Sequence, residues 1–367
     1  MIVFRRLVQL VDSYIDPRRL VGSNLRAYLS PLNLAILASV AFSYFIFGKA
    51  GLLLATPDSG SAALWLPAGI CLAAVLLRGN RVWPGIFAGA FLVGISSGGS
   101  ILGTLGMALD STLEALTGAY LVNRFANGIN AFYRPKDLLR FVFLAGVLPT
   151  AFCATIGVRL LYRGGFAGWT DYWLAWSVWW VGDLLGIIIA TPFLVLLLGR
   201  RHHSLSLAEH FELTLLMAGL AVVCVLIFGP PTVAWIPRSG LIYLCAPFLV
   251  WSALRFCPLE AAGATLIVSG FALWGSLHGY GPYGNSTSSQ FLIAGYLAVT
   301  GAMTMTIAAA SAQQKRETEN VLGMYHILKE VSDGEINALQ GTVEAFRVGL
   351  ARHGLHGKGR PTDMTKP

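Results

Sequence analysis

The sequence predicts an all-α fold, a polytopic transmembrane helix bundle that ends in a short cytoplasmic helical tail. Three observations support this prediction. About ten apolar stretches follow one another between short polar or basic loops, hydrophobic residues make up 55% of the chain, and charged residues make up only 12%. The charged share is about half that of a soluble domain, which excludes an ordinary water-soluble core.

The apolar stretches are about 14 to 26 residues long, and most are close to the length that a helix needs to cross the hydrocarbon layer. The predicted spans are 32–54, 62–77, 82–97, 101–122, 138–161, 173–198, 211–228, 241–254, 259–277 and 291–310. The eighth span is the shortest and contains Pro247, so we expect it to be re-entrant or tilted. The chain then has eight or ten full crossings.

Basic residues fall in alternate loops and so predict the orientation of the spans. One side carries Arg5, Arg6, Arg18, Arg19, Arg26, Arg78, Arg81, Arg124, Arg134, Lys136, Arg140, Arg200, Arg201, Arg255, Lys315 and Arg316, and the other only Lys49, Arg163 and Arg238. By the positive-inside rule both termini are cytoplasmic, in a bacterial plasma (inner) membrane. The net charge of +8 indicates contact with the anionic lipid bilayer and argues against nucleic acid as a partner.

Composition divides the chain into four parts. Residues 1–30 form a basic cytoplasmic segment, 31–312 the integral-membrane domain, 313–353 a cytoplasmic amphipathic helical extension, and 354–367 a disordered tail. In the extension, two registers of apolar residues flank the sequence from Ser332 to Gly334, which predicts two short helices. These helices either pack on each other or on lipid, or form a coiled coil in a homodimer.

Four ionisable residues lie in predicted spans, where a charge is costly and therefore indicates a site. Asp110 and Glu114 are four residues apart and share a helical face, and Asp183 lies at a similar depth in the sixth span. Arg159 in the fifth span is a candidate partner for these acids. Two neighbouring carboxylates repel each other when both are ionised, which favours a shared proton or a bound cation. The alternative is a structural hydrogen-bonded network that binds nothing.

Aromatic residues and prolines surround the acids in the sequence. The tryptophans from Trp169 to Trp176 predict an interfacial belt, whereas Trp179 and Trp180, one turn from Asp183, are candidates for a pocket wall or for core packing. Prolines inside predicted spans are expected to kink their helices, as happens around ligand sites in transporters: Pro67, Pro84, Pro149 and Pro192.

The sequence predicts no cofactor, no metal and no catalytic residue. The cysteines Cys71, Cys153, Cys224, Cys245 and Cys257 form no close pair, and the histidines His202, His203 and His210 share a basic loop without a metal-ligand pattern. No common catalytic motif is present, so we expect a protein that is not an enzyme. An intramembrane enzyme that uses Cys153 lacks a histidine base at comparable depth.

Several segments, taken in order, resemble the bacterial membrane-associated sensor domain family of the first type (MASE) over about residues 30–312. They are Trp65–Gly69, Trp83–Phe91, Leu113–Ala119, Trp179–Gly186 with Thr191-Pro192, Leu254–Phe256 and Gly279–Pro282. The residues that fall on the family pattern are Trp65, Pro67, Glu114, Trp180, Gly182, Asp183 and Arg255. Asp110-Ser111-Thr112 departs from it, because relatives tend to have Gly-Asn-Thr there.

The resemblance implies a multi-helix sensory module that precedes a histidine kinase, a diguanylate cyclase or a cyclic-di-GMP phosphodiesterase in relatives. It thereby implies a part in two-component or cyclic-di-GMP signalling. About fifty residues follow the last predicted span, too few for such an output domain. We therefore expect either a cytoplasmic signalling partner or an output domain missing from this chain.

The leading hypothesis is a sensory module that detects a small ligand or protonation within the membrane. Its expected ligand-binding or sensing residues are Glu114, Asp183, Trp180, Arg159, Asp110, Trp65 and Pro67. The ligand itself is unknown. The alternative is an ion-coupled membrane transporter, which midplane acids and kinked helices also suit. No clear internal repeat relates the two halves of the chain.

Overall fold

The computed structural model describes residues 30–53, 64–163, 172–199, 205–230, 238–280, 282 and 287–352. Over these ranges the regular structure is entirely helical, so the all-α prediction is confirmed. The predicted tail 354–367 and all but Ser30 of the predicted basic segment 1–30 lie outside the described residues, as do His202 and His203.

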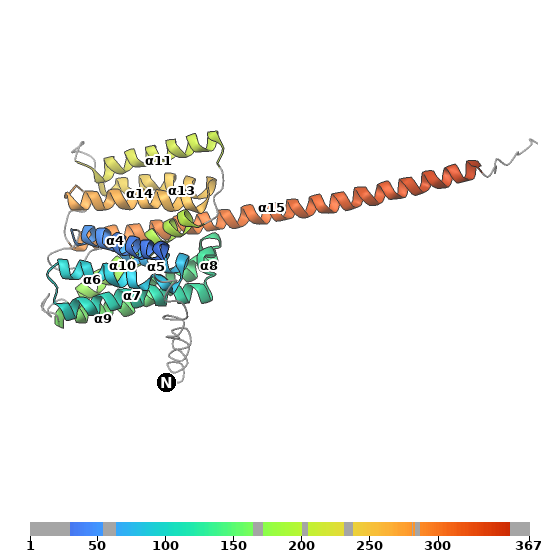
Figure 1. The fold of residues 1–367 in the computed structure, drawn as a ribbon. Coiled ribbons are helices and arrows are strands. Elements are labelled where there is room, and N and C mark those ends of the chain that lie inside the picture. Colours follow the sequence, from blue (N-terminus) through green and yellow to red (C-terminus); the bar gives the residue numbers. More distant parts are fainter. Residues whose placement is uncertain are drawn as a thin grey trace, which may run out of the picture. The chain divides into compact units, whose positions relative to one another are not determined.

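Each predicted apolar stretch is mainly helical in its described part (Figure 1). The α-helices are α4 (Pro31–Leu53), α5 (Leu66–Arg78), α6 (Trp83–Ser96), α7 (Ile101–Phe125), α8 (Pro135–Phe141), α9 (Leu148–Arg163), α10 (Tyr172–Leu198), α11 (Leu207–Phe228), α12 (Arg238–Leu241), α13 (Cys245–Arg255), α14 (Pro258–Leu277) and α15 (Thr287–Arg352). A π-helical segment, η3 (Val142–Val147), joins α8 to α9, and 3₁₀ turns lie at η1 (Asn80–Val82), η2 (Gly128–Tyr133) and η5 (Ile242–Leu244).

Six of the described helices are long and apolar enough to cross a membrane, which supports a multi-pass membrane protein. They are Pro31–Leu53, Pro135–Leu160, Tyr172–Leu198, Leu207–Phe228, Pro258–Ser276 and Phe291–Lys329. The predicted eight to ten crossings are not confirmed. With 13 and 14 residues, α5 and α6 are about 20 Å long, short of the ~30 Å hydrocarbon layer. Helix α7 is longer, but Asp110 and Glu114 lower its hydropathy.

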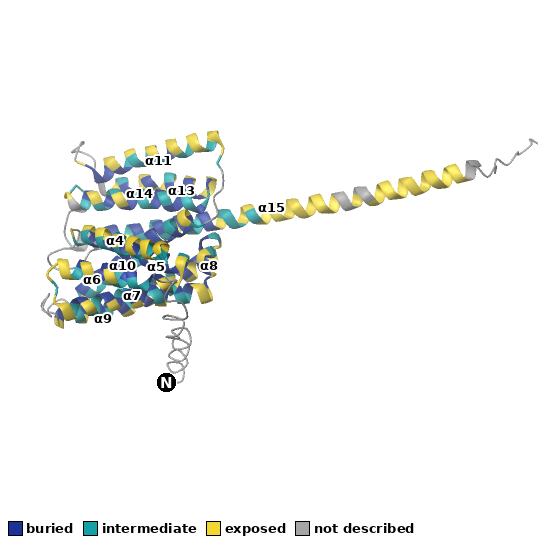
Figure 2. Ribbon diagram, in the orientation of Figure 1, coloured by how far each residue is buried: buried dark blue, intermediate teal, exposed yellow. Residues whose placement is uncertain are grey.

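Helix α10 lies at the centre of the bundle, where it packs against α5, α9 and α14. From Gly182 to Pro192 every residue except Leu184 is buried (Figure 2). Its Ile187 belongs to a core built mainly by α4 to α7, and its Leu185 to a second core built by α11, α13, α14 and α15. A helix that is apolar on all sides is expected in such an interior position.

The backbones of α5 and α10 approach each other closely at two glycines. A Cβ added at Gly69 would overlap the Gly186 carbonyl, and a Cβ added at Gly186 would overlap the Trp65 carbonyl. Two hydrogen bonds hold this crossing: the Trp65 backbone N–H donates to the Gly182 oxygen at 2.9 Å, and Thr191 Oγ1 donates to the Gly69 oxygen at 3.0 Å. Small residues permit such contacts between membrane helices.

The prediction that four prolines kink their helices is wrong for two of them. Pro67 and Pro84 lie in the first two positions of α5 and α6, where a missing N–H breaks no helical hydrogen bond. Pro149 lies inside the continuous helical run Pro135–Leu160, directly after its π-helical segment. Pro192 likewise lies inside its helix, α10.

The chain divides into two units, Met1–Gln313 and Gln314–Pro367. The second unit is helical as far as Arg352, because α15 continues through Ser332, Asp333 and Gly334. The predicted break into two helices is therefore wrong. Single residues of modest helix propensity are tolerated when strong helix formers flank them. Residues 317–329 are all exposed.

The glycine crossing yields a first prediction. Replacing Gly186 by Ala places a methyl group against the Trp65 carbonyl, and overpacking of this kind costs about 1–3 kcal/mol. We expect a lower thermal unfolding midpoint in detergent for the full chain. The control is Gly270→Ala in α14, where an added Cβ meets nothing within 4 Å. Equal midpoints for the two variants would show that the close contact does not exist.

Candidate functional site

A cavity of about 310 Å³ lies among α4, α5, α6, α7, α9 and α10. Three carboxylates line it, those of Asp110 and Glu114 from α7 and of Asp183 from α10. Three aromatic side chains form part of its wall: Tyr44, Trp65 and Trp179. The structure thus brings together the three acids whose depth and spacing the sequence singled out.

The three carboxylates are almost completely shielded from solvent. Asp110 is 5% exposed, Glu114 6% and Asp183 3%. No lysine, arginine or histidine is among the described residues that line the cavity. A buried carboxylate is stable only when it is protonated or paired with a positive charge. The cavity is therefore suited to a proton or a cation.

Hydrogen bonds satisfy part of this polar surface. Trp179 and Asp183 lie one turn apart on α10 and both line the cavity, and the Tyr44 and Ser111 hydroxyls lie 3.0 Å apart. Two buried oxygens, Asp110 Oδ1 and Thr104 Oγ1, have no hydrogen-bond partner among the described residues. Buried polar atoms are nearly always paired in proteins, so each of these orphans needs an explanation.

Glycines on the neighbouring helices make room for these side chains. A Cβ at Gly157 of α9 would lie 2.8 Å from Trp179 Cζ2 and 3.2 Å from Asp110 Oδ2. A Cβ at Gly94 of α6 would lie 2.7 Å from Thr104 Cγ2. Both glycines therefore act through the absence of a side chain. Sequence reasoning missed them because it considered polar and aromatic residues only.

Arg159 is not the partner of the acids. It is exposed on α9, and no ion pair joins it to a described carboxylate. The reason is helical phase. Gly157 faces Asp110, and a residue two positions further along a helix points about 200° away. The prediction that Arg159 pairs with the acids is wrong.

Trp180 and Pro67 also lie outside the lining of the cavity. Trp180 stacks on Trp176 with ring centroids 5.4 Å apart and donates to the Val147 oxygen at 3.3 Å. That carbonyl belongs to the π-helical segment. Pro67 is buried at the start of α5, next to the glycine crossing. Trp65 and Trp179, by contrast, line the cavity.

The carboxylates are not arranged as a metal site. Over the described ranges, no group of three or more His, Cys, Asp or Glu side chains lies at metal-binding spacing. Apolar side chains also line the cavity, among them Leu52, Val93 and Leu160. A small ligand with a polar end and an apolar end matches this lining better than a fully coordinated ion does.

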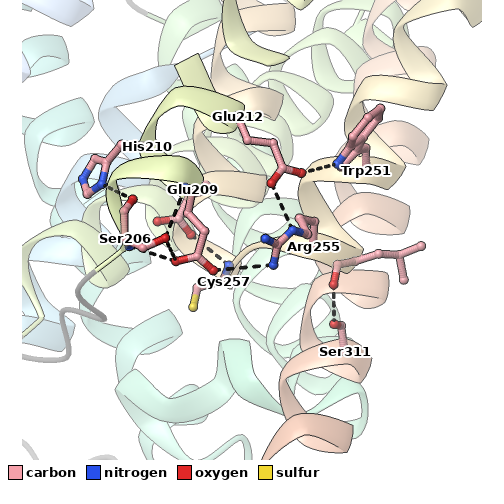
Figure 3. A network of polar contacts seen from close by, with 10 residues as sticks. Ser206, Glu209, His210, Glu212, Trp251, Arg255, Cys257 and Ser311 are labelled. Atoms are coloured by element: carbon pink, nitrogen blue, oxygen red, sulfur yellow. Dashed lines mark hydrogen bonds and ion pairs between the residues drawn. The ribbon is translucent and has the colours of Figure 1, made fainter. Parts of the chain in front are cut away.

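A second polar group, which we call the Arg255 network, joins the start of α11 to the end of α13, which in turn is bonded to α15 (Figure 3). Arg255 contacts Glu209 Oε1 at 3.5 Å and Glu212 Oε2 at 3.1 Å. Trp251 Nε1 donates to Glu212 Oε1 at 3.1 Å. Ser311 of α15 donates to the Leu254 carbonyl at 3.0 Å. Arg255 falls on the family pattern in the sequence, but its role in this network was not predicted.

The fold and the cavity define a multi-pass, all-helical membrane protein with a buried acidic site in its first unit. The model of the MASE1 family matches residues 34–315, most of the chain. The chain therefore belongs to the MASE1 membrane-associated sensor domain family, and the predicted resemblance is confirmed. No curated protein and no solved structure matched the chain.

The orphaned oxygen of Asp110 yields a second prediction. An unpaired buried carboxylate opposes folding, so its removal does not destabilise a protein that holds it for function. We expect Asp110→Leu to keep an unfolding midpoint equal to or above that of the wild type in ligand-free buffer. Asp137→Leu is the control and should lower the midpoint, because Asp137 accepts a hydrogen bond from Arg140 at 3.3 Å.

Midpoints that fall equally in the two variants would contradict this interpretation. Asp110 would then belong to a structural network that supports the fold, as the alternative interpretation of the sequence holds.

Proposed function

We propose that this protein is a sensory module of the bacterial inner membrane, which detects a small ligand or protonation in its acidic cavity and signals to a cytoplasmic output partner. One observation carries the proposal. Asp110, Glu114 and Asp183 line a single buried cavity whose described lining includes no cation. Such a cavity changes its electrostatic energy strongly when a proton or a cation enters.

Helix α10 offers a direct route from the cavity to α15. Asp183 and Trp179 line the cavity from α10, and Ile188 lies little more than one turn further along the same helix. A Cβ at Gly301 of α15 would lie 3.5 Å from Ile188 Cγ2, so the two helices touch there. Met305 and Ala309 of α15 share a core with Ile187. A shift of α10 therefore acts on α15 through packed side chains.

The Arg255 network also holds α15, at Ser311, about three turns beyond Gly301. Its Ser311–Leu254 hydrogen bond attaches α15 to the end of α13, and Arg255 attaches α13 to α11. In this proposal, α15 is held between a changeable contact with α10 and a fixed contact with α13. A small displacement at Gly301 then turns into a rotation or tilt of α15.

The positive-inside pattern orients the module. With both termini cytoplasmic, the extension after Ala310 meets its output partner in the cytoplasm. The exposed apolar residues Leu328, Leu339, Val343 and Phe346 give this extension a surface for a histidine kinase, a cyclic-di-GMP enzyme or a second copy of the chain. We propose signalling through two-component or cyclic-di-GMP pathways on the strength of the MASE1 membership.

Hydrogen–deuterium exchange tests the sensing route. The full chain in lipid nanodiscs is compared between mildly acidic and mildly alkaline buffer, and with a panel of small cations, anions and neutral molecules. Exchange is expressed as protection factors, which correct for the intrinsic rise of amide exchange with pH, and we expect at least one condition to change it in residues 297–311 of α15. The change should disappear in Glu114→Gln and Asp183→Asn, because these variants alter the charge of the cavity. Asp137→Asn, outside the cavity, should retain it.

Exchange in residues 297–311 that is the same under every condition in the folded wild type would refute the sensor. A change that persists in both cavity variants would show that sensing takes place elsewhere.

A further inference from the structure

The cavity allows the ligand class to be named, an inference that rests on the proposed sensing function. We propose that the cavity binds a small protonated primary amine, whose ammonium group lies among Asp110, Glu114 and Asp183 and whose carbon chain lies against Trp65 and Trp179. Four properties of the cavity support this assignment: its charge, its unpaired oxygens, its aromatic wall and its volume.

The charge of the cavity selects a cation. Asp110 and Glu114 lie one turn apart on α7, and Asp183 lines the same cavity from α10. The nearby Lys49 does not supply the missing positive charge. Its Nζ donates to Ser97 Oγ at 2.8 Å, at the loop that closes one end of the cavity, and no ion pair joins it to a described carboxylate. An anionic ligand would instead be repelled by three carboxylates.

The unpaired oxygens select a cation that donates hydrogen bonds. Asp110 Oδ1 and Thr104 Oγ1 lack partners, on residues that are 5% and 2% exposed, and both residues line the cavity. A primary ammonium group carries three N–H donors, and hydrogen bonds from a cation to a carboxylate are the strong kind. A quaternary ammonium ion has the charge but no N–H to offer these atoms.

The wall and the volume select an organic molecule. Trp65 and Trp179 line the cavity, and an indole ring attracts both an alkyl chain and a neighbouring cation. A cavity of about 310 Å³ falls at the small end of the range for ligand sites, which suits a short-chain amine. A bare divalent ion would leave most of this volume empty, and the described acids do not form a metal-ligand cluster.

Three probes of similar size separate charge from hydrogen-bond donation. The full chain is placed in phosphatidylglycerol nanodiscs, which contain no amine, and titrated with n-butylammonium, tetramethylammonium or 1-butanol near neutral pH. We expect n-butylammonium to raise the unfolding midpoint in a saturable way. Tetramethylammonium should bind about tenfold or more weakly, because it lacks N–H donors, and 1-butanol should have no effect.

Matched variants locate the site. Asp110→Asn keeps the shape of the side chain and should weaken n-butylammonium binding about tenfold or more. Trp179→Phe reduces the aromatic face and should weaken binding to a smaller degree. Asp137→Asn and Trp173→Phe are the controls, because Asp137 and Trp173 do not line the cavity and Trp173 is 74% exposed. Binding measured by calorimetry on the folded controls should match the wild type.

The same experiment identifies the source of the amine. Repeating the titration in nanodiscs that contain phosphatidylethanolamine adds a lipid whose headgroup is a primary amine. If this headgroup occupies the cavity, added n-butylammonium will stabilise the protein less than it does in phosphatidylglycerol. If the natural ligand is a free amine, the lipid will make no difference. Either result supports the primary-ammonium chemistry.

Three outcomes would overturn the proposal: equal stabilisation by n-butylammonium and 1-butanol, unchanged n-butylammonium binding in Asp110→Asn, or no stabilisation by any of the three probes. The sensing function itself would survive these outcomes if exchange in α15 still responded to pH through Glu114 and Asp183. If n-butylammonium had no effect on the unfolding midpoint and exchange in α15 did not respond to pH, both the amine proposal and the sensing function would be contradicted.

Discussion

The contact between Gly69 of α5 and Gly186 of α10 is the constraint on which the acidic site depends. No side chain larger than hydrogen fits between these backbones, and the Trp65–Gly182 hydrogen bond fixes their register. That register sets Trp65, at the start of α5, beside the stretch of α10 that carries Trp179 and Asp183. Without the crossing, the aromatic wall and one of the three carboxylates would not face a common cavity.

The polar groups of the cavity lower the stability of the surrounding helix bundle. Three buried carboxylates and two orphaned oxygens oppose folding, whereas the apolar contacts of α10 on both of its sides favour it. Strained or unsatisfied groups of this kind are typical of functional sites, which a protein retains at some expense of stability. Because residues of α10 belong to both cores, a displacement of α10 at Asp183 alters the packing in both.

The sequence predicted the fold class and the meeting of the acids, because both follow from simple periodicity. Asp110 and Glu114 share a face at a spacing of one turn, and residue counting placed Asp183 at the same depth. The finer placements depend on helical phase and on neighbouring helices. Trp179 lines the cavity and Trp180 does not, although they are adjacent in the chain. Arg159 points away because Gly157 occupies the inward position.

Other features had no sequence signal of sufficient strength. The roles of Gly69 and Gly157 come from what packs against them, and the π-helical segment that accepts a hydrogen bond from Trp180 has no distinct composition. Helix α15 continues through Ser332–Gly334 because a helix interior tolerates single poor formers. Hydropathy does not determine the number of crossings either, because α5 and α6 are short and α7 carries two acidic residues.

The central claim is that the state of the acidic cavity reaches α15 through α10. Electron cryomicroscopy of the full chain in phosphatidylglycerol nanodiscs, with and without n-butylammonium, tests it most directly. Our account predicts density for the ligand among Asp110, Glu114 and Asp183, together with a changed contact between Ile188 and Gly301. An occupied cavity with an unchanged Ile188–Gly301 contact would contradict the account.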